Sequence, residues 1–165
     1  LAVGGRDVIT EGEAVQAVQE ALARAVSGDM HGGAELLIPL ITDSCGSAYA
    51  LAAMLAETAA SITRRDLGRG HFGIAVAHER TGAPASTDDL PPDVAFATRF
   101  TAAWANRDQD TAEALLLALM NRTGPDGAEL VEGLLALFQL AVFTAAALVE
   151  EQRGATTRSR EESAE

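Results

Sequence analysis

The sequence contains no lysine, one cysteine and few aromatic residues. The single thiol, Cys45, cannot form an internal disulfide, so the composition excludes a disulfide-stapled secreted scaffold and favours a cytoplasmic protein. Aromatic residues make up 4% of the chain and apolar residues 48%, so most of the apolar content is alanine, leucine and valine. Alanine and leucine have high helix propensity, which predicts an all-α fold.

The chain also lacks the motifs that carry metal, nucleotide or cofactor chemistry. Neither HExxH nor CxxC spacing occurs, and the glycine pair Gly32-Gly33 matches neither a P-loop nor a dinucleotide-binding fingerprint. We therefore predict no metal, no cofactor and no catalytic residue. Cys45, which precedes a predicted helix, is interpreted as a buried structural thiol.

Positive charge is scarce, because 12 basic residues stand against 24 acidic ones and the formal net charge is -12. A surface of this charge repels phosphate backbones, so we expect no direct binding to nucleic acid. The most apolar stretch, 133–149, is close to the lower length limit for a bilayer-spanning helix and includes Gln139 and Thr144. We expect the rest of the chain to cover it and predict no membrane span.

What the chain does have is one long helical stretch, 125–152, whose apolar residues cover almost every face. A helix of that kind is surrounded by other helices, so we predict that it is the central helix of a bundle, with Phe138 and Phe143 in the core. This helix is expected to end near Gly154. Residues 154–165 are rich in Thr, Ser, Arg and Glu, which predicts a disordered polar tail.

Five shorter helices are predicted before the central one, from capping residues and apolar periodicity. Thr10 and Glu13 form a capping box that begins the first helix, Pro92 begins the fourth, and a similar box at 110–113 opens the fifth. The segment 67–91 is punctuated by glycine and proline and is predicted to be a long loop, in which 72–76 reads as a short strand.

The predicted helices repeat one plan of long, short and long. The halves 10–66 and 92–153 align at a constant offset that pairs Ala25 with Ala103, which suggests a duplication; the alternative is that alanine- and leucine-rich helices align through composition alone. We therefore predict a single domain, 1–153. Its fold is an all-α bundle of about six helices, built of two pseudo-repeated three-helix units around the C-terminal apolar helix.

The one locally basic segment of this acidic chain lies at the start of the long loop and beside it. Its residues are Arg64, Arg65, Arg69, His71, His78 and Arg80. Binding residues often lie on loops held by a rigid scaffold, so we predict a site for an anion or an acidic partner. The alternative is a solvated loop whose arginines balance nearby carboxylates.

The third and sixth predicted helices carry wide apolar faces, more than one bundle of this size can cover. We therefore predict a non-enzymatic helical interaction or scaffold domain that forms a homo-oligomer or binds a protein partner. The alternative is a small-molecule-binding or enzymatic bundle, with a pocket between helices and the 67–91 loop as its lid.

Overall fold

The computed structural model describes residues 9–162, and the side chains of 9–159. The fold in this part of the chain is all-helical, with six α-helices and no strand, which confirms the predicted fold class. In chain order the elements are α1 Glu11–Val26, α2 Met30–Asp43, α3 Cys45–Leu67, the 3-10 turn η1 Thr87–Asp89, α4 Pro92–Ala105, α5 Gln109–Arg122 and α6 Ala128–Glu162.

Side-chain caps set where several of these helices begin. The capping box predicted at the start of α1 is confirmed: the Glu13 amide donates to the Thr10 hydroxyl at 3.3 Å, and the Thr10 amide donates to the Glu13 carboxylate at 2.8 Å. The start predicted for the fifth helix at 110–113 is wrong. Asp108 accepts from the Thr111 amide at 3.1 Å and begins α5 two residues earlier, because a short aspartate side chain reaches a free amide of the first turn directly.

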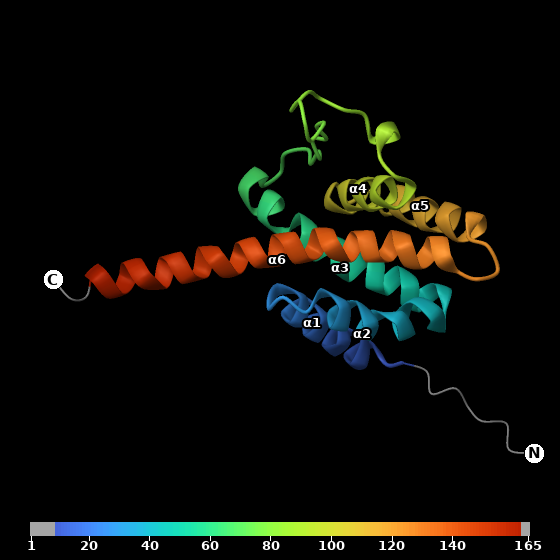
Figure 1. Ribbon diagram of the computed structural model, residues 1–165, viewed down its shortest axis with the longest axis horizontal. Helices are drawn as coiled ribbons and strands as arrows, with labels where there is room; N and C mark the ends of the chain where they lie inside the picture. The colour runs from blue at the N-terminus through green and yellow to red at the C-terminus, as the bar shows by residue number, and fades with distance from the viewer. Residues whose placement is uncertain (1–8, 163–165) are drawn as a thin grey trace, which may run out of the picture.

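Helix α6 is the centre of the bundle, as predicted. It runs through the middle of the molecule, with the α1–α2 hairpin on one side, the α4–α5 hairpin on the other and α3 crossing behind it (Figure 1). It contacts each of the other five α-helices. An apolar helix with neighbours on several sides buries residues around much of its circumference, which is why its sequence shows no clean polar face.

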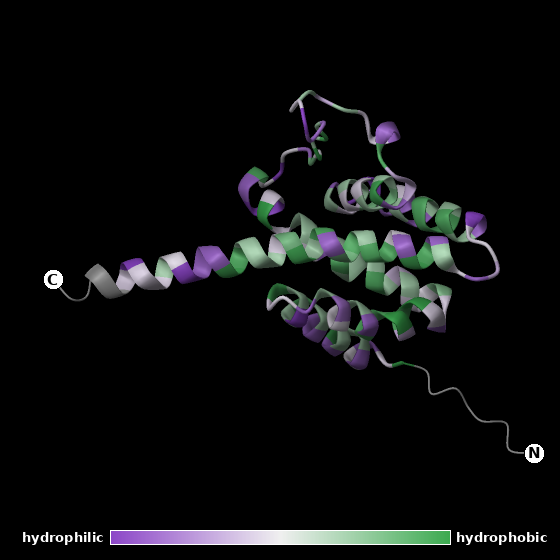
Figure 2. Ribbon diagram, in the orientation of Figure 1, coloured by the Kyte–Doolittle hydropathy of each residue, from purple (hydrophilic) through white to green (hydrophobic). Residues whose placement is uncertain are grey.

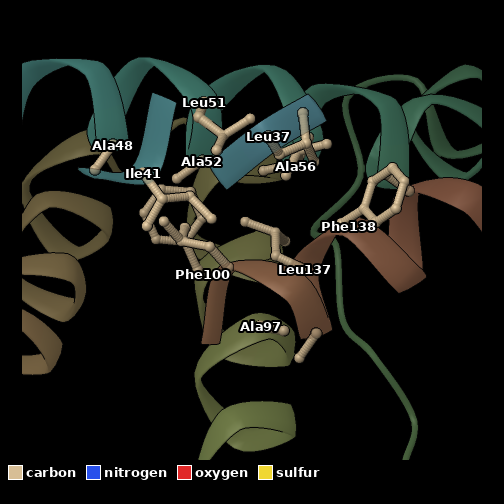
Figure 3. Packing of buried hydrophobic residues seen from close by; sticks show 14 of the residues in the cluster. Leu37, Ile41, Ala48, Leu51, Ala52, Ala56, Ala97, Phe100, Leu137 and Phe138 are labelled. Carbon is tan, nitrogen blue, oxygen red and sulfur yellow. The ribbon is translucent and has the colours of Figure 1, made fainter. Parts of the chain in front are cut away.

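The core lies where α2, α3, α4 and α6 meet. Leu37 from α2, Leu51 from α3, Phe100 from α4 and Phe138 from α6 point into one shared space, and each is at most 1% exposed (Figure 3). Burying a side chain of this size contributes about 1.5–3 kcal/mol. Four fully buried alanines recur at every fourth residue of α3, and their small side chains let neighbouring elements lie close: Ala48, Ala52, Ala56 and Ala60.

The two halves of the chain share one local geometry. The α1–α2 turn has Ser27 as the helix cap, Gly28 at φ 101° and Asp29 capping the next helix. The α4–α5 turn repeats this with Asn106, Arg107 at φ 62° and Asp108. Helices α2 and α5 both have 14 residues. The two-unit plan is therefore present in the structure.

The register predicted for the two halves is wrong by one residue. The turns pair Gly28 with Arg107 and Asp29 with Asp108, so Ala25 corresponds to Trp104 and not to Ala103. Alanine-rich segments align almost equally well at neighbouring offsets, whereas the left-handed turn position and the aspartate cap fix one register.

Helix α6 is longer than predicted. It does not end near Gly154 but continues to Glu162, so residues 154–162 are helical instead of irregular. The hydroxyls of Thr156 and Thr157 donate to the carbonyl oxygens of Gln152 and Arg153, at 3.0 and 3.1 Å, so these polar side chains are accommodated within the helix. The last part of the helix projects from the bundle (Figure 1). Residues 163–165 of the predicted tail lie outside the described residues.

The predicted strand at 72–76 is also absent from the structure. The loop holds one isolated antiparallel bridge, between Ala77 and Pro84, with the His78 amide donating to the Ala83 carbonyl at 2.9 Å. A strand needs a partner along its length, and here only a few residues of the loop face one another.

The prediction that excluded a membrane span is wrong. Two helices, Cys45–Leu67 and Ala128–Ser159, are long and apolar enough to cross a membrane by length and composition. The prediction considered only the stretch 133–149, whereas α6 has 35 residues. In the bundle, 33% and 39% of the residues in their apolar windows are buried. Core helices of bundles meet the same two criteria, so length and composition neither exclude a membrane span nor show one.

Candidate functional site

A basic cleft of about 770 Å³ lies between the C-terminal half of α3, the first residues of the long loop and the α4–α5 turn. These three elements meet at one end of the bundle, above α6 (Figure 1). The cleft is lined by Glu57, Ser61, Arg64, Arg65, Gly68, Arg69, Gly70, His71, Ala105, Asn106 and Arg107. Four arginines and a histidine therefore surround it, against one carboxylate. We call this surface the arginine cleft.

The structure divides the predicted site residues into two groups. Four of the six line the arginine cleft: Arg64, Arg65, Arg69 and His71. His78 and Arg80 do not line it and lie further along the loop, where the His78 carbonyl accepts from the amides of Thr81 and Gly82 at 3.3 and 2.8 Å. Only Gly68 to His71 of the loop border the cleft, so the loop contributes one wall.

Two of the cleft arginines are tied to carboxylates. The Arg64 guanidinium donates to both oxygens of Glu57, at 2.7 and 2.9 Å, and Glu57 also accepts from the Trp104 indole at 2.9 Å. Arg65 bridges to Glu151 of α6 at 2.9 Å and to Asp66 at 3.0 Å. These hydrogen bonds, with Glu151 first, raise the pKa of Arg65. Arg64 and Arg65 therefore fit the alternative prediction, in which the arginines balance nearby carboxylates.

The other two arginines have no such partner. Among the described side chains, neither Arg69 nor Arg107 forms an ion pair with a carboxylate. The nearest acidic residue in sequence to Arg107 is Asp108, whose carboxylate already accepts from the amide and hydroxyl of Thr111 at 3.1 and 2.7 Å. Arg69 and Arg107 thus line the cleft without a carboxylate partner among the described side chains.

Arg107 was not predicted from the sequence, and its backbone is unusual. Its φ of 62° is the only positive φ of a non-glycine residue in the described part of the chain. The left-handed conformation costs an ordinary L-residue about 1–2 kcal/mol, and the matching position in the first half is a glycine, Gly28. When the two halves of the chain are aligned by their turns, Arg107 falls opposite Gly28, and this alignment would have drawn attention to the arginine.

Asn106 fixes the two walls of the cleft relative to each other. Its side-chain amide accepts from the Phe72 backbone amide at 2.7 Å and donates to the Phe72 carbonyl at 2.9 Å. The Phe72 ring is 5% exposed and packs in a small cluster with Ala60 and Ala105. The start of the loop is therefore docked onto the α4–α5 turn, although it has no regular secondary structure.

A second surface of interest is the outward face of α6. Phe143 was predicted to lie in the core and is instead 75% exposed, more than any other large apolar side chain described. Ala147, one turn later, is also exposed, while Leu140 and Ala146 are half-buried. The prediction failed because this helix is apolar on all sides and its five neighbours leave one side open. Figure 2 shows α6 as mostly apolar where it crosses the bundle, with polar turns between the apolar ones.

The remaining candidates offer less. Cys45 is exposed, so its interpretation as a buried thiol is wrong; it is the first residue of α3, directly after the Ser44 cap, and it lies at the bundle surface. Within the described residues, no group of three or more His, Cys, Asp or Glu side chains is arranged to hold a metal ion.

No protein-family model, no curated protein and no solved structure matches this chain.

Proposed function

We propose that this chain is a non-enzymatic helical interaction domain whose copies associate through the open face of α6. The observation that carries the proposal is the 75% exposure of Phe143 on the most central helix of the bundle. The other exposed large apolar side chains range from 36% to 48% exposure. Moving a phenylalanine from water into a packed interface contributes about 1.5–3 kcal/mol, so the exposed ring favours a partner.

The shape of α6 favours a second copy as that partner. Beyond Phe143 the helix carries three consecutive alanines, Ala145 to Ala147, followed by the half-buried Leu148 and Val149. Small side chains let two helix axes approach closely, and most homo-oligomers are closed two-fold dimers in which one patch meets itself. Because the helix then leaves the bundle, a second helix meets no obstruction from the chain's own hairpins along that part (Figure 1).

Charge at the edge of this face is compatible with self-pairing. Glu150 forms an ion pair with Arg153 of the same helix at 2.7 Å, and Glu151 with Arg65 of α3 at 2.9 Å. The carboxylates that border the apolar segment are thus neutralised within each copy, which lowers the repulsion between two copies of a chain with net charge -12.

The test compares two substitutions at exposed apolar positions. Phe143→Glu places a charge on the proposed interface, and Leu117→Glu makes the same change on α5, where the side chain is 48% exposed. By sedimentation velocity, we expect Phe143→Glu to weaken self-association by at least about tenfold and Leu117→Glu to leave it unchanged. Equal behaviour of the two variants contradicts the proposal. Flotation with lipid vesicles that depends on Phe143 would instead assign this face to a bilayer.

A further inference from the structure

We propose that the arginine cleft is a binding site for a phosphomonoester or diphosphate group of a small ligand, held mainly by Arg69 and Arg107. This function is separate from self-association through α6. Positive charge is concentrated at this cleft. The chain has 12 basic residues in all and a net charge of -12, and four arginines line this one cleft. A positive site on an acidic protein focuses a small anion into it.

The four arginines of the cleft differ in whether a carboxylate holds them. Arg64 and Arg65 are held by Glu57 and Glu151, so they shape the wall of the cleft and contribute little net charge. Arg69 and Arg107 have no ion pair among the described side chains. The guanidinium group presents a planar fork of donors that matches the oxygens of a phosphate, which makes two such groups in one cleft well suited to a doubly charged phosphate.

Arg107 has an unfavourable backbone conformation. A position that is glycine in the first half of the chain, Gly28 at φ 101°, is here an arginine at φ 62°. A residue held in a strained backbone conformation at the mouth of a cleft points to a function for its side chain. The turn would form more easily with glycine, and what the arginine adds is a positively charged side chain on a residue that lines the cleft.

The backbone of the two cleft walls is held in place before a ligand arrives. Asn106 joins the α4–α5 turn to the loop through its two hydrogen bonds with Phe72, at 2.7 and 2.9 Å. This joint fixes Arg107, on one wall, relative to Arg69 and His71, on the other. Because the backbone of the two walls is already fixed, binding does not have to order it.

The surroundings of the cleft limit the size of the ligand. A volume of about 770 Å³ admits a molecule of metabolite size. The acidic remainder of the surface repels a long polyanion such as a nucleic acid, so the phosphate belongs to a small molecule or to a lipid headgroup. Soluble pyrophosphate and phosphatidic acid vesicles distinguish these two sources.

The test is calorimetric titration of the full chain with inorganic pyrophosphate and with inorganic phosphate. The variants are Arg69→Ala, which removes one free guanidinium, and Arg107→Gly, which also relieves the backbone at φ 62°. Arg80→Ala is the matched control, because Arg80 lies in the same loop but does not line the cleft. We expect each cleft variant to weaken binding by about tenfold or more, and the control to change it by less than about twofold.

A second arm uses phosphatidylcholine vesicles with and without phosphatidic acid. Pyrophosphate binding that depends on Arg107 assigns a soluble phosphorylated ligand; binding only to phosphatidic acid vesicles, again dependent on Arg107, assigns a lipid headgroup. Either result supports the phosphate site. The proposal is overturned if neither probe binds at millimolar concentration, or if Arg80→Ala loses as much affinity as Arg107→Gly. Urea unfolding of Arg107→Gly, expected to show undiminished stability, excludes misfolding as the cause of lost binding.

Discussion

The side-chain amide of Asn106 holds the backbone of Phe72, 34 residues earlier, with its oxygen at 2.7 Å and its nitrogen at 2.9 Å. This is the joint between the α4–α5 turn and the long loop. Asn106→Ala leaves the Phe72 amide and carbonyl without these partners in a partly buried place, and we expect a loss of about 1–3 kcal/mol in the free energy of unfolding. Hydrogen exchange at the Phe72 amide should accelerate beyond what this global loss explains.

Asn121→Ala is the control for this prediction, because Asn121 is exposed on α5 and forms no side-chain hydrogen bond in the structure. We expect its unfolding free energy to stay within about 0.5 kcal/mol of the parent value. Slow exchange at Phe72 in Asn106→Ala would show that packing of the Phe72 ring alone holds the loop.

The equivalent turn positions Gly28 and Arg107 should respond to substitution in opposite directions. Gly28 has φ 101°, so Gly28→Ala forces a side chain into an unfavourable backbone region and should lower stability by about 1 kcal/mol. Arg107→Gly removes the corresponding strain at φ 62° and should leave stability unchanged or raise it by up to about 1 kcal/mol. Urea unfolding measures both; a clear loss of stability in Arg107→Gly would show that the arginine serves the fold.

Close packing at Gly33 predicts a steric cost that another helical glycine does not share. A Cβ atom at Gly33 would lie 2.6 Å from the carbonyl oxygen of Ala21 and 3.2 Å from the Phe138 ring. Because backbone stands in the way, we expect Gly33→Ala to destabilise the fold by about 1–3 kcal/mol. At Gly154, where nothing lies within 4 Å, the same change should favour the helix. Thermal unfolding that falls equally in both variants would contradict this packing.

Acid should weaken the cap of α5. The hydroxyl and amide of Thr111 donate to the Asp108 carboxylate and lower its pKa below the ordinary aspartate value. Since folding lowers this pKa, the carboxylate stabilises the folded chain above the unfolded pKa, and the contribution is lost as the pH falls through the folded value. Asp108→Asn retains a cap but does not titrate. The stability difference between parent and variant should therefore shrink between about pH 5 and pH 2, as urea unfolding would show; a constant difference would contradict the linkage.

The sequence was most informative where a local rule decides the structure. Thr10 with Glu13, and also Pro92, predicted a helix start, because capping and the missing amide of proline act within one turn. The identification of α6 as the central helix followed from its unbroken apolar character. Four residues of the arginine cleft were also predicted, because α3 and the loop that follows it are adjacent in sequence.

Features that depend on distant packing could not be predicted in the same way. Phe143 and Phe138 lie on the same apolar helix, and only the placement of its five neighbours decides that one is exposed and the other buried. Arg107 lines the cleft because the α4–α5 turn contacts the loop. In the sequence, only the register of the repeat distinguishes this arginine. The length of α6 was underestimated because polar residues beyond Gly154 are compatible with a helix in solvent.

The most direct test of self-association through α6 is the absolute mass of the unmodified chain in solution, measured by light scattering over a concentration series. The exposed Phe143 face predicts a species of two chains or more at micromolar concentration, which dissociates on dilution and in Phe143→Glu. The mass of a single chain at every concentration would contradict the proposal that copies meet through this helix.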